Sequence, residues 1–139
     1  MITEDYVSFE TAKLLKEKGF DEPCALTEFD LDAYKKWVET APRPITLDAE
    51  SEKPFRYSVP SIYVALKWLR EVHNQIIVPG IRVDDRTSGI INCYIVGIWY
   101  IPKNNGGAFC YTSPTPYNGY PSYEAASEAA IRYCLENLI

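Results

Sequence analysis

Residues 87–123, which read TSGIINCYIVGIWYIPKNNGGAFCYTSPTPYNGYPSY, decide what kind of fold this chain adopts. The stretch carries a single charged side chain, Lys103, and its aromatic residues are Tyr94, Trp99, Tyr100, Phe109, Tyr111, Tyr117, Tyr120 and Tyr123. Its glycine, proline and asparagine content excludes a long helix, and Asn104-Asn105-Gly106-Gly107 is a hairpin turn signal. The stretch therefore predicts two β-strands, at 89–101 and 108–113, that pair across this turn and lead into a loop at 114–121.

The flanking elements predict that residues 58–139 form the core of an α+β fold. Pro60 suits the first turn of a helix that ends near Asn74, because the proline has no N–H to leave unsatisfied there. A further strand at 75–83 follows, and Ser122 caps a final helix. The order is therefore α-β-β-β-α, with a three-stranded antiparallel sheet that N-terminal strands can extend and both helices on one face.

Both faces of the long strand at 89–101 are apolar. One alternating set is Ile91, Cys93, Ile95 and Trp99, and the other is Ile90, Tyr94, Val96, Ile98 and Tyr100. A strand with one solvated face alternates apolar and polar residues, so this pattern predicts burial on both sides. We expect the N-terminal region, residues 1–57, to cover the second face; a partner subunit is the main alternative.

The N-terminal region has its own helical signals. Ser8 is placed to cap a helix that Gly19 ends, because glycine readily takes the left-handed conformation at a helix end. Beyond it the pattern predicts a short strand at 24–29, a helix that Asp30 or Asp32 caps and that runs to Thr40, and a strand at 55–59. No linker or repeat divides the sequence, so residues 1–139 are predicted to be a single domain.

Charge is distributed unevenly along the chain. The chain has a net charge of -5, and all of this excess lies in residues 1–57, which hold eight Lys or Arg and thirteen Asp or Glu. Residues 58–139 hold six of each kind and have no net charge. An acidic excess is repelled by phosphate backbones and anionic membranes, so nucleic acid is not an expected partner. The sequence shows no signal segment and no apolar run of about 20 residues, which predicts no membrane association and a cytoplasmic location.

The sequence contains no recognisable catalytic or metal-binding arrangement. Cys24, Cys93, Cys110 and Cys134 form no Cys-x-x-Cys pair, and His73 is the only histidine, so we expect no catalytic residue, no metal and no cofactor. His73 lies near the end of a predicted helix, where an imidazole can satisfy terminal carbonyls or interact with the helix dipole. A small enzyme with an unrecognised site stays as an alternative.

An interaction surface is the more specific hypothesis. Tyr111, Tyr117 and Tyr120 lie among prolines and a glycine, and tyrosine combines apolar area with a polar tip that suits interfaces. Loop tyrosines also lie flat on their own core, so both interpretations stay open. The predicted function is a non-enzymatic binding or accessory protein that acts through protein–protein contacts, with a homodimer or another protein as partner.

The helix, three-strand, helix order of residues 58–139 resembles the double-stranded RNA-binding domain at the level of topology. That family carries a lysine-rich cluster at the start of its last helix, which grips phosphates. Here the corresponding residues 122–128 contain two acids, Glu124 and Glu128, and no base. A degenerate nucleic-acid module is therefore a secondary alternative.

Three segments resemble a group of small uncharacterised bacterial proteins that are often found near phage or mobile-element genes. They are residues 6–19, residues 67–74 (KWLREVHN) and the span from Tyr123-Glu124 to Leu135. The resemblance covers most of the chain in order, but its motifs form helices and carry no known chemistry. It implies a cytoplasmic accessory protein associated with phage or mobile elements, and no site residue follows from it.

Overall fold

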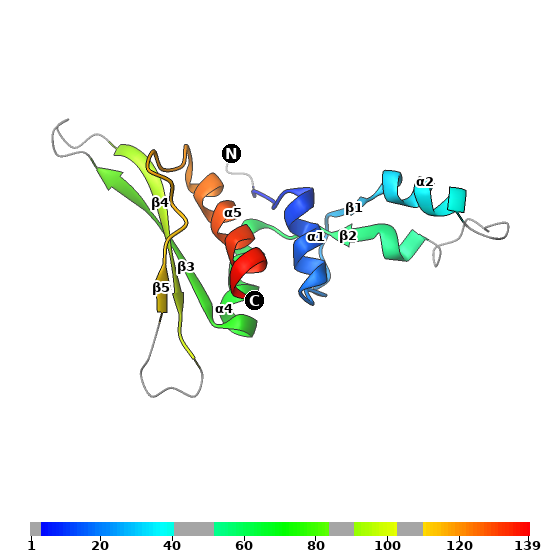
Figure 1. Cartoon of the computed structure of the whole chain (residues 1–139), viewed down its shortest axis with the longest axis horizontal. Coiled ribbons are helices and arrows are strands. Elements are labelled where there is room, and N and C mark those ends of the chain that lie inside the picture. The colour runs from blue at the N-terminus through cyan, green and yellow to red at the C-terminus, as the bar shows by residue number, and fades with distance from the viewer. Residues whose placement is uncertain (1–3, 41–51, 84–90, 103–109) are drawn as a thin grey trace.

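The computed structural model of the chain (Figure 1) describes residues 4–40, 52–83, 91–102 and 110–139. It confirms an α+β fold with antiparallel sheets and an N-terminal helix. The turn that the sequence predicts at 104–107 lies outside the described residues. Among the residues described, no helix is long and apolar enough to cross a lipid bilayer.

The larger sheet is a three-stranded antiparallel meander. Its strands are β3 (Gln75–Val83), β4 (Ile91–Tyr100) and β5 (Cys110–Thr112), with β4 in the centre. β3 is an edge strand, which is where a proline such as Pro79 is tolerated. Beyond β5 the chain returns to β4, and the backbones of Tyr94 and Tyr120 exchange hydrogen bonds of 3.0 and 2.8 Å. The predicted strand order is therefore confirmed.

Two helices, α4 (Ile62–His73) and α5 (Tyr123–Tyr133), pack on one face of this sheet. Their ends follow local signals. The hydroxyls of Ser61 and Ser122 accept hydrogen bonds from the N–H groups of Val64 and Ala125, and Asn74 ends α4 in the left-handed conformation. A single π-helical turn, η3 (Cys134–Leu138), continues α5.

The core lies between these helices and the inner face of the sheet. Val96 and Ile98 of β4 are each 1% exposed, and burying such a side chain contributes about 1.5–3 kcal/mol. On α5 the small residues Ala126 and Ala130 are fully buried and allow the helix to approach closely. The buried cluster also includes Ala65, Leu69, Ile131, Cys134 and Leu135.

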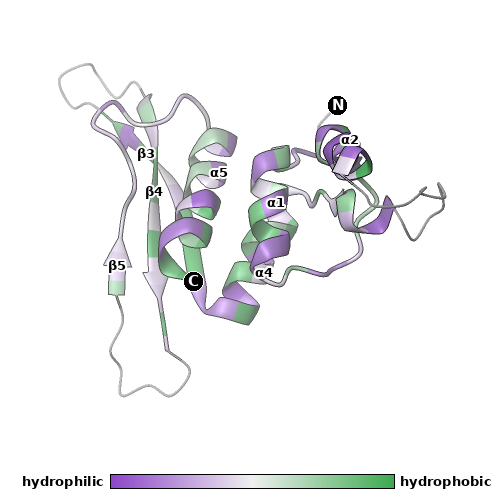
Figure 2. Cartoon of the chain, turned by 45° about the vertical axis from the view of Figure 1, so that its right-hand side comes forward, coloured by the Kyte–Doolittle hydropathy of each residue, from purple (hydrophilic) through white to green (hydrophobic). Residues whose placement is uncertain are grey.

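The N-terminal helix α1 (Phe9–Glu17) packs on the opposite side of α5, so that α5 lies between α1 and the sheet (Figure 2). Ala12 and Leu15 are fully buried in the shared core. A polar clamp fixes this contact: one carboxylate oxygen of Glu128 accepts hydrogen bonds from the Ser8 N–H at 2.6 Å and the Thr11 hydroxyl at 2.9 Å. The acid therefore sits at the start of α1, where the helix dipole favours negative charge.

Residues 27–40 and 52–58 form an arm that projects away from this body (Figure 1). The arm consists of β1 (Thr27–Phe29), α2 (Leu31–Thr40), a 3-10 turn η1 (Lys53–Phe55) and β2 (Arg56–Ser58), with β1 and β2 paired antiparallel. The rings of Phe29, Trp37 and Phe55 surround Tyr34 at centroid distances of 5.3–6.0 Å. The arm therefore has a small aromatic core of its own.

The expectation that residues 1–57 cover the second face of the sheet is wrong for the residues described. α1 packs against α5 and η3, and the arm extends further from the sheet. The apolar stripe of α1 finds its partner on α5, so the helix layer separates the N-terminal region from β3, β4 and β5. On the second face Val78 is 51% exposed.

The Glu128 clamp predicts a specific loss of stability. Replacing Glu128 with Ala leaves the Ser8 and Thr11 donors without their charged acceptor, and we expect a loss of about 1.5–3 kcal/mol in the free energy of unfolding. Glu128→Gln retains an acceptor oxygen and should lose less. The control Glu136→Ala removes only an exposed i,i+4 pair with Arg132 and should cost about 0.5 kcal/mol or less. Urea unfolding measures all three, and an equal loss for the Glu136 and Glu128 variants would contradict the clamp.

Two glycines with positive φ form a matched pair for a second test. Gly19 (φ 96) has open space around it, whereas a Cβ on Gly119 (φ 68) would overlap the Cys93 side chain and lie 2.9 Å from the Tyr94 carbonyl oxygen. Gly19→Ala should therefore cost only the left-handed strain, about 1–2 kcal/mol. Gly119→Ala adds overpacking and should cost roughly 2–5 kcal/mol. Equal urea midpoints for the two variants would refute the close packing at Gly119.

Candidate functional site

The second face of the three-stranded sheet is the candidate site, and we call it the outer face. It is defined by the side chains of Ile76, Val78, Ile95, Trp99 and Tyr111, which the strand register places together: Ile76 lies opposite Trp99, which in turn lies opposite Tyr111. Val78 and Ile95 face Gly97 and Gly80 across the β3–β4 pair. The face is therefore an apolar surface on which two positions, Gly80 and Gly97, carry no side chain.

Tyr111 lies flat on this surface. Its ring packs against Trp99 with centroids 4.6 Å apart, and a Cβ on Gly97 would lie 2.7 Å from the Tyr111 ring. The glycine thus gives the ring room to rest on the strand. Tyr111 is still 56% exposed, so most of its area is available for contact.

The loop after β5 closes one end of the outer face. Arg82 of β3 donates a hydrogen bond of 2.7 Å to the Tyr117 carbonyl oxygen, and Cys93, beneath Gly119, is 8% exposed. The hydroxyls of Ser113 and Thr115 hydrogen-bond to the Val96 carbonyl and hold the loop along β4. The accessible part of the outer face therefore lies toward Val78, Trp99 and Tyr111.

The three tyrosines singled out in the sequence have different positions. Tyr111 lies on the outer face, and Tyr117 is 93% exposed on the adjoining loop. Tyr120 is half-buried against the core, where its hydroxyl donates to the Pro114 carbonyl oxygen at 3.1 Å and burial raises its pKa. The structure therefore separates Tyr120, which supports the fold, from Tyr111 and Tyr117, which face solvent.

Sequence reasoning did not assign Ile76, Val78, Ile95 and Trp99 to an interaction surface. The sequence pattern that points to this surface is present in β4, where both alternating sets of residues are apolar. In the structure the described members of the two sets lie on opposite faces of the strand. Only packing distinguishes them, since Val96 and Ile98 meet the helices while Ile95 and Trp99 do not belong to that core.

The outer face is nearly uncharged. Among the described residues of the three strands, Arg82 is the only one with a formal charge. The predicted capping acid Asp30 lies in the arm instead: it caps α2 through the Ala33 N–H at 3.1 Å and pairs with Lys13 at 2.7 Å. The hydrogen bond from Lys13 and that from Ala33 hold the pKa of the Asp30 carboxyl below its usual range.

Within residues 4–40, 52–83, 91–102 and 110–139, no three His, Cys, Asp or Glu side chains gather as metal ligands. Cys134 is fully buried, and burial raises the pKa of its thiol to about 12, so it is not a thiolate at neutral pH. The apolar outer face suits association with another apolar surface.

His73 lies in the last turn of α4, near the negative end of the helix dipole, but among the described residues its side chain satisfies no terminal carbonyl. No hydrogen bond joins its imidazole to a helix carbonyl; the ring packs edge-on against Trp68, with centroids 4.7 Å apart, and its Nε2 is buried without a hydrogen-bond partner. Asn74 ends the helix instead, through its N–H to the Leu69 carbonyl. Burial and, secondarily, the charge of Lys18 lower the pKa of His73.

Comparisons with known protein families, with curated proteins and with solved structures find no match to this chain.

The position of His73 predicts its titration. Folding lowers the pKa of His73, so the unfolded chain binds the imidazole proton more tightly than the folded chain does. The contribution of the neutral imidazole to the free energy of unfolding is therefore complete above the unfolded pKa of about 6.5. It is lost as the pH falls through the pKa of the folded state. The Cε1–H signal of this single histidine, followed by NMR, should titrate below about 6.5. Lys18→Gln should raise the pKa only in part, because burial is the larger cause. A pKa at or above the unfolded value would refute this environment.

Proposed function

We propose that this chain is a non-enzymatic binding protein that acts through protein–protein contacts, and that its contact surface is the outer face of the sheet. The observation that carries the proposal is that Val78 and Tyr111 are each more than half exposed on a face whose other described side chains, apart from Arg82 at one end, are also apolar. Exposed apolar patches of this kind are typical of interaction sites.

We propose a second copy of the chain as the partner. Among the described residues the face has one charge, Arg82, at the end that the loop closes, so two copies can stack these faces without bringing the acidic N-terminal regions together. Sheets that pack face to face lie about 10 Å apart with interdigitated side chains. A twofold arrangement would place Tyr111 and Val78 of each copy against the other.

The dimensions of the sheet set the strength of this association. A nine-residue strand is about 30 Å long, and three strands span about 14 Å, which gives roughly 400 Å² per copy. The total of roughly 800 Å² is at the low end for specific interfaces, so we expect a weak, reversible dimer with a Kd of the order of micromolar or above.

The cellular setting is also proposed. Cys24, Cys93, Cys110 and Cys134 are free thiols, the usual state in a reducing compartment, which supports the cytoplasm. The resemblance to bacterial proteins encoded near phage or mobile-element genes is consistent with an accessory role there. Nucleic acid stays an unexpected partner, because Glu124 is exposed at the start of α5 and Glu128 is engaged by α1.

A matched pair of valines tests the proposed surface. Val78 on the outer face and Val72 on α4 are 51% and 52% exposed, so a lysine costs each site a similar amount of apolar area. In Val78→Lys the two copies would place like charges at their contact, and we expect dimerisation to weaken by roughly tenfold or more. Val72→Lys should associate as the wild type does. Sedimentation equilibrium over about 1 µM to 1 mM measures both.

A wild-type chain that keeps the mass of one copy across this range would contradict the proposal. Equal weakening by the two lysine variants would also count against it, because the effect would then arise from charge in general and not from the outer face.

A further inference from the structure

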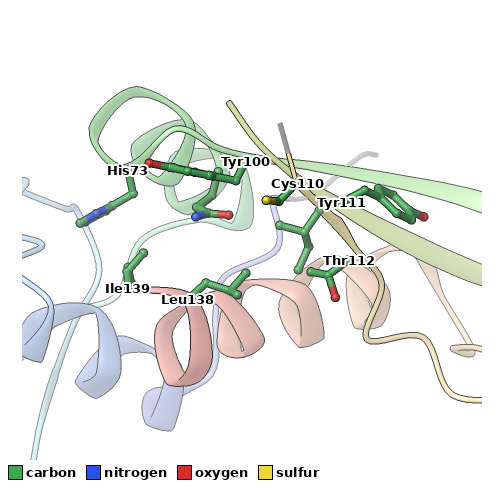
Figure 3. A pocket seen from close by; sticks show the side chains of 9 residues that line it. His73, Tyr100, Cys110, Tyr111, Thr112, Leu138 and Ile139 are labelled. Carbon is green, nitrogen blue, oxygen red and sulfur yellow. The ribbon is translucent and has the colours of Figure 1, made fainter. Parts of the chain in front are cut away.

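A pocket of about 680 Å³ lies on the other side of the sheet, at the end where β3, β4 and β5 meet the last turn of the C-terminal helix (Figure 3). Its apolar walls are Ile98 of β4 and, across from it, Leu138 and Ile139. The Tyr111 ring points away from this group, in keeping with its place on the outer face. The volume is within the range of small-molecule sites, about 300–1,000 Å³.

A buried glutamine, Gln75, is one of the residues that line this pocket. Gln75 is 4% exposed, and its Oε1 has no hydrogen-bond partner. Buried polar atoms are paired in the great majority of cases, so an orphaned acceptor beside a pocket calls for a partner. If the amide is turned by 180°, a buried donor is left instead, so the conclusion does not depend on its orientation.

The other polar side chains among the described residues that line the pocket are uncharged. His73 contributes a second buried, unpartnered atom, its Nε2, and Tyr100 and Thr112 contribute hydroxyls. Figure 3 shows the Tyr100 ring reaching toward His73. The charge of Lys18, which contributes to the lowered pKa of His73, lies beside the pocket, since its Nζ donates to the Ile139 carbonyl oxygen at 2.8 Å. None of the described side chains that line the pocket carries a formal charge.

We infer that this pocket binds a small uncharged molecule that combines an apolar body with an amide-like edge. A carboxamide presents a donor and an acceptor side by side, so Gln75 pairs best with an edge that presents the complementary acceptor and donor. Ile98, Leu138 and Ile139 cover the apolar body. A carboxylate at the same position is disfavoured, because it would be desolvated against Gln75 Oε1 and no described side chain of the lining is cationic to neutralise it.

A pair of probes of the same shape tests this site on the wild-type protein. Indole-3-acetamide carries the amide, and indole-3-acetate replaces it with a carboxylate. We expect the amide to bind with a Kd of the order of 0.1–1 mM, as is usual for a probe of this size, and the acid to bind roughly tenfold or more weakly. ¹H–¹⁵N NMR reports directly, because Gln75 is the only glutamine and His73 the only histidine.

Two variants complete the experiment. Gln75→Leu replaces the amide with an apolar side chain of similar size. It should weaken binding of indole-3-acetamide roughly tenfold or more, because the donor and acceptor of the amide are lost. Asn137→Leu removes an exposed amide on the same C-terminal turn, outside the pocket lining, and should bind the probe as the wild type does. Val78→Lys, which alters only the outer face, should also bind normally and so separates this site from the dimer surface.

The inference is overturned if the Gln75 side-chain signals do not move with indole-3-acetamide, if the acetate binds equally well, or if Gln75→Leu binds as tightly as the wild type. The comparison of the two probes uses unaltered protein, so it decides the question even if the Gln75 variant does not fold.

Discussion

The apolar contact between the inner face of β4 and the helices α4 and α5 is the interaction on which the rest of the structure depends. Val96 and Ile98 are almost fully buried in it, and Ala126 and Ala130 bring α5 close to the sheet. Because this contact buries only one face of the central strand, the other face of that strand forms part of the outer face of the sheet. The pocket opens where the inner contact ends, at the last turn of the helix.

The same contact explains where the N-terminal region lies. α5 is apolar toward the sheet and also toward α1, and Glu128 binds the start of α1 through Ser8 and Thr11. The body is therefore layered as sheet, helices and α1, with the arm beyond. A segment on the far side of the helices cannot also reach the outer face, which is why that face meets solvent in a single chain.

The two proposed sites occupy opposite sides of one sheet and suit different chemistry. The outer face is broad and apolar, and Arg82 at its closed end is the one charge among its described residues, so it suits another protein surface. The pocket is concave and has buried polar atoms without partners at Gln75 and His73, so it suits a small molecule. Neither site requires a side chain with a catalytic pKa.

Much of the fold could be predicted from the sequence because its signals are local. Ser8, Asp30 and Ser122 cap the helices where their spacing places them, and the doubly apolar strand is the centre of the sheet. Such hydrogen bonds and alternations join residues a few positions apart. The sequence by itself therefore determined the elements, their order and the two apolar faces of β4.

Only the tertiary structure decided which apolar set meets the helices, where α1 lies and what surrounds Gln75 and His73. Ile95 and Ile98 are equally apolar, so no local pattern distinguishes the exposed face from the buried one. The choice depends on contacts between residues far apart in the chain, such as those of β4 with α5 and of Ser8 with Glu128. The physical reason is that burial is a property of the assembled layers and not of any single segment.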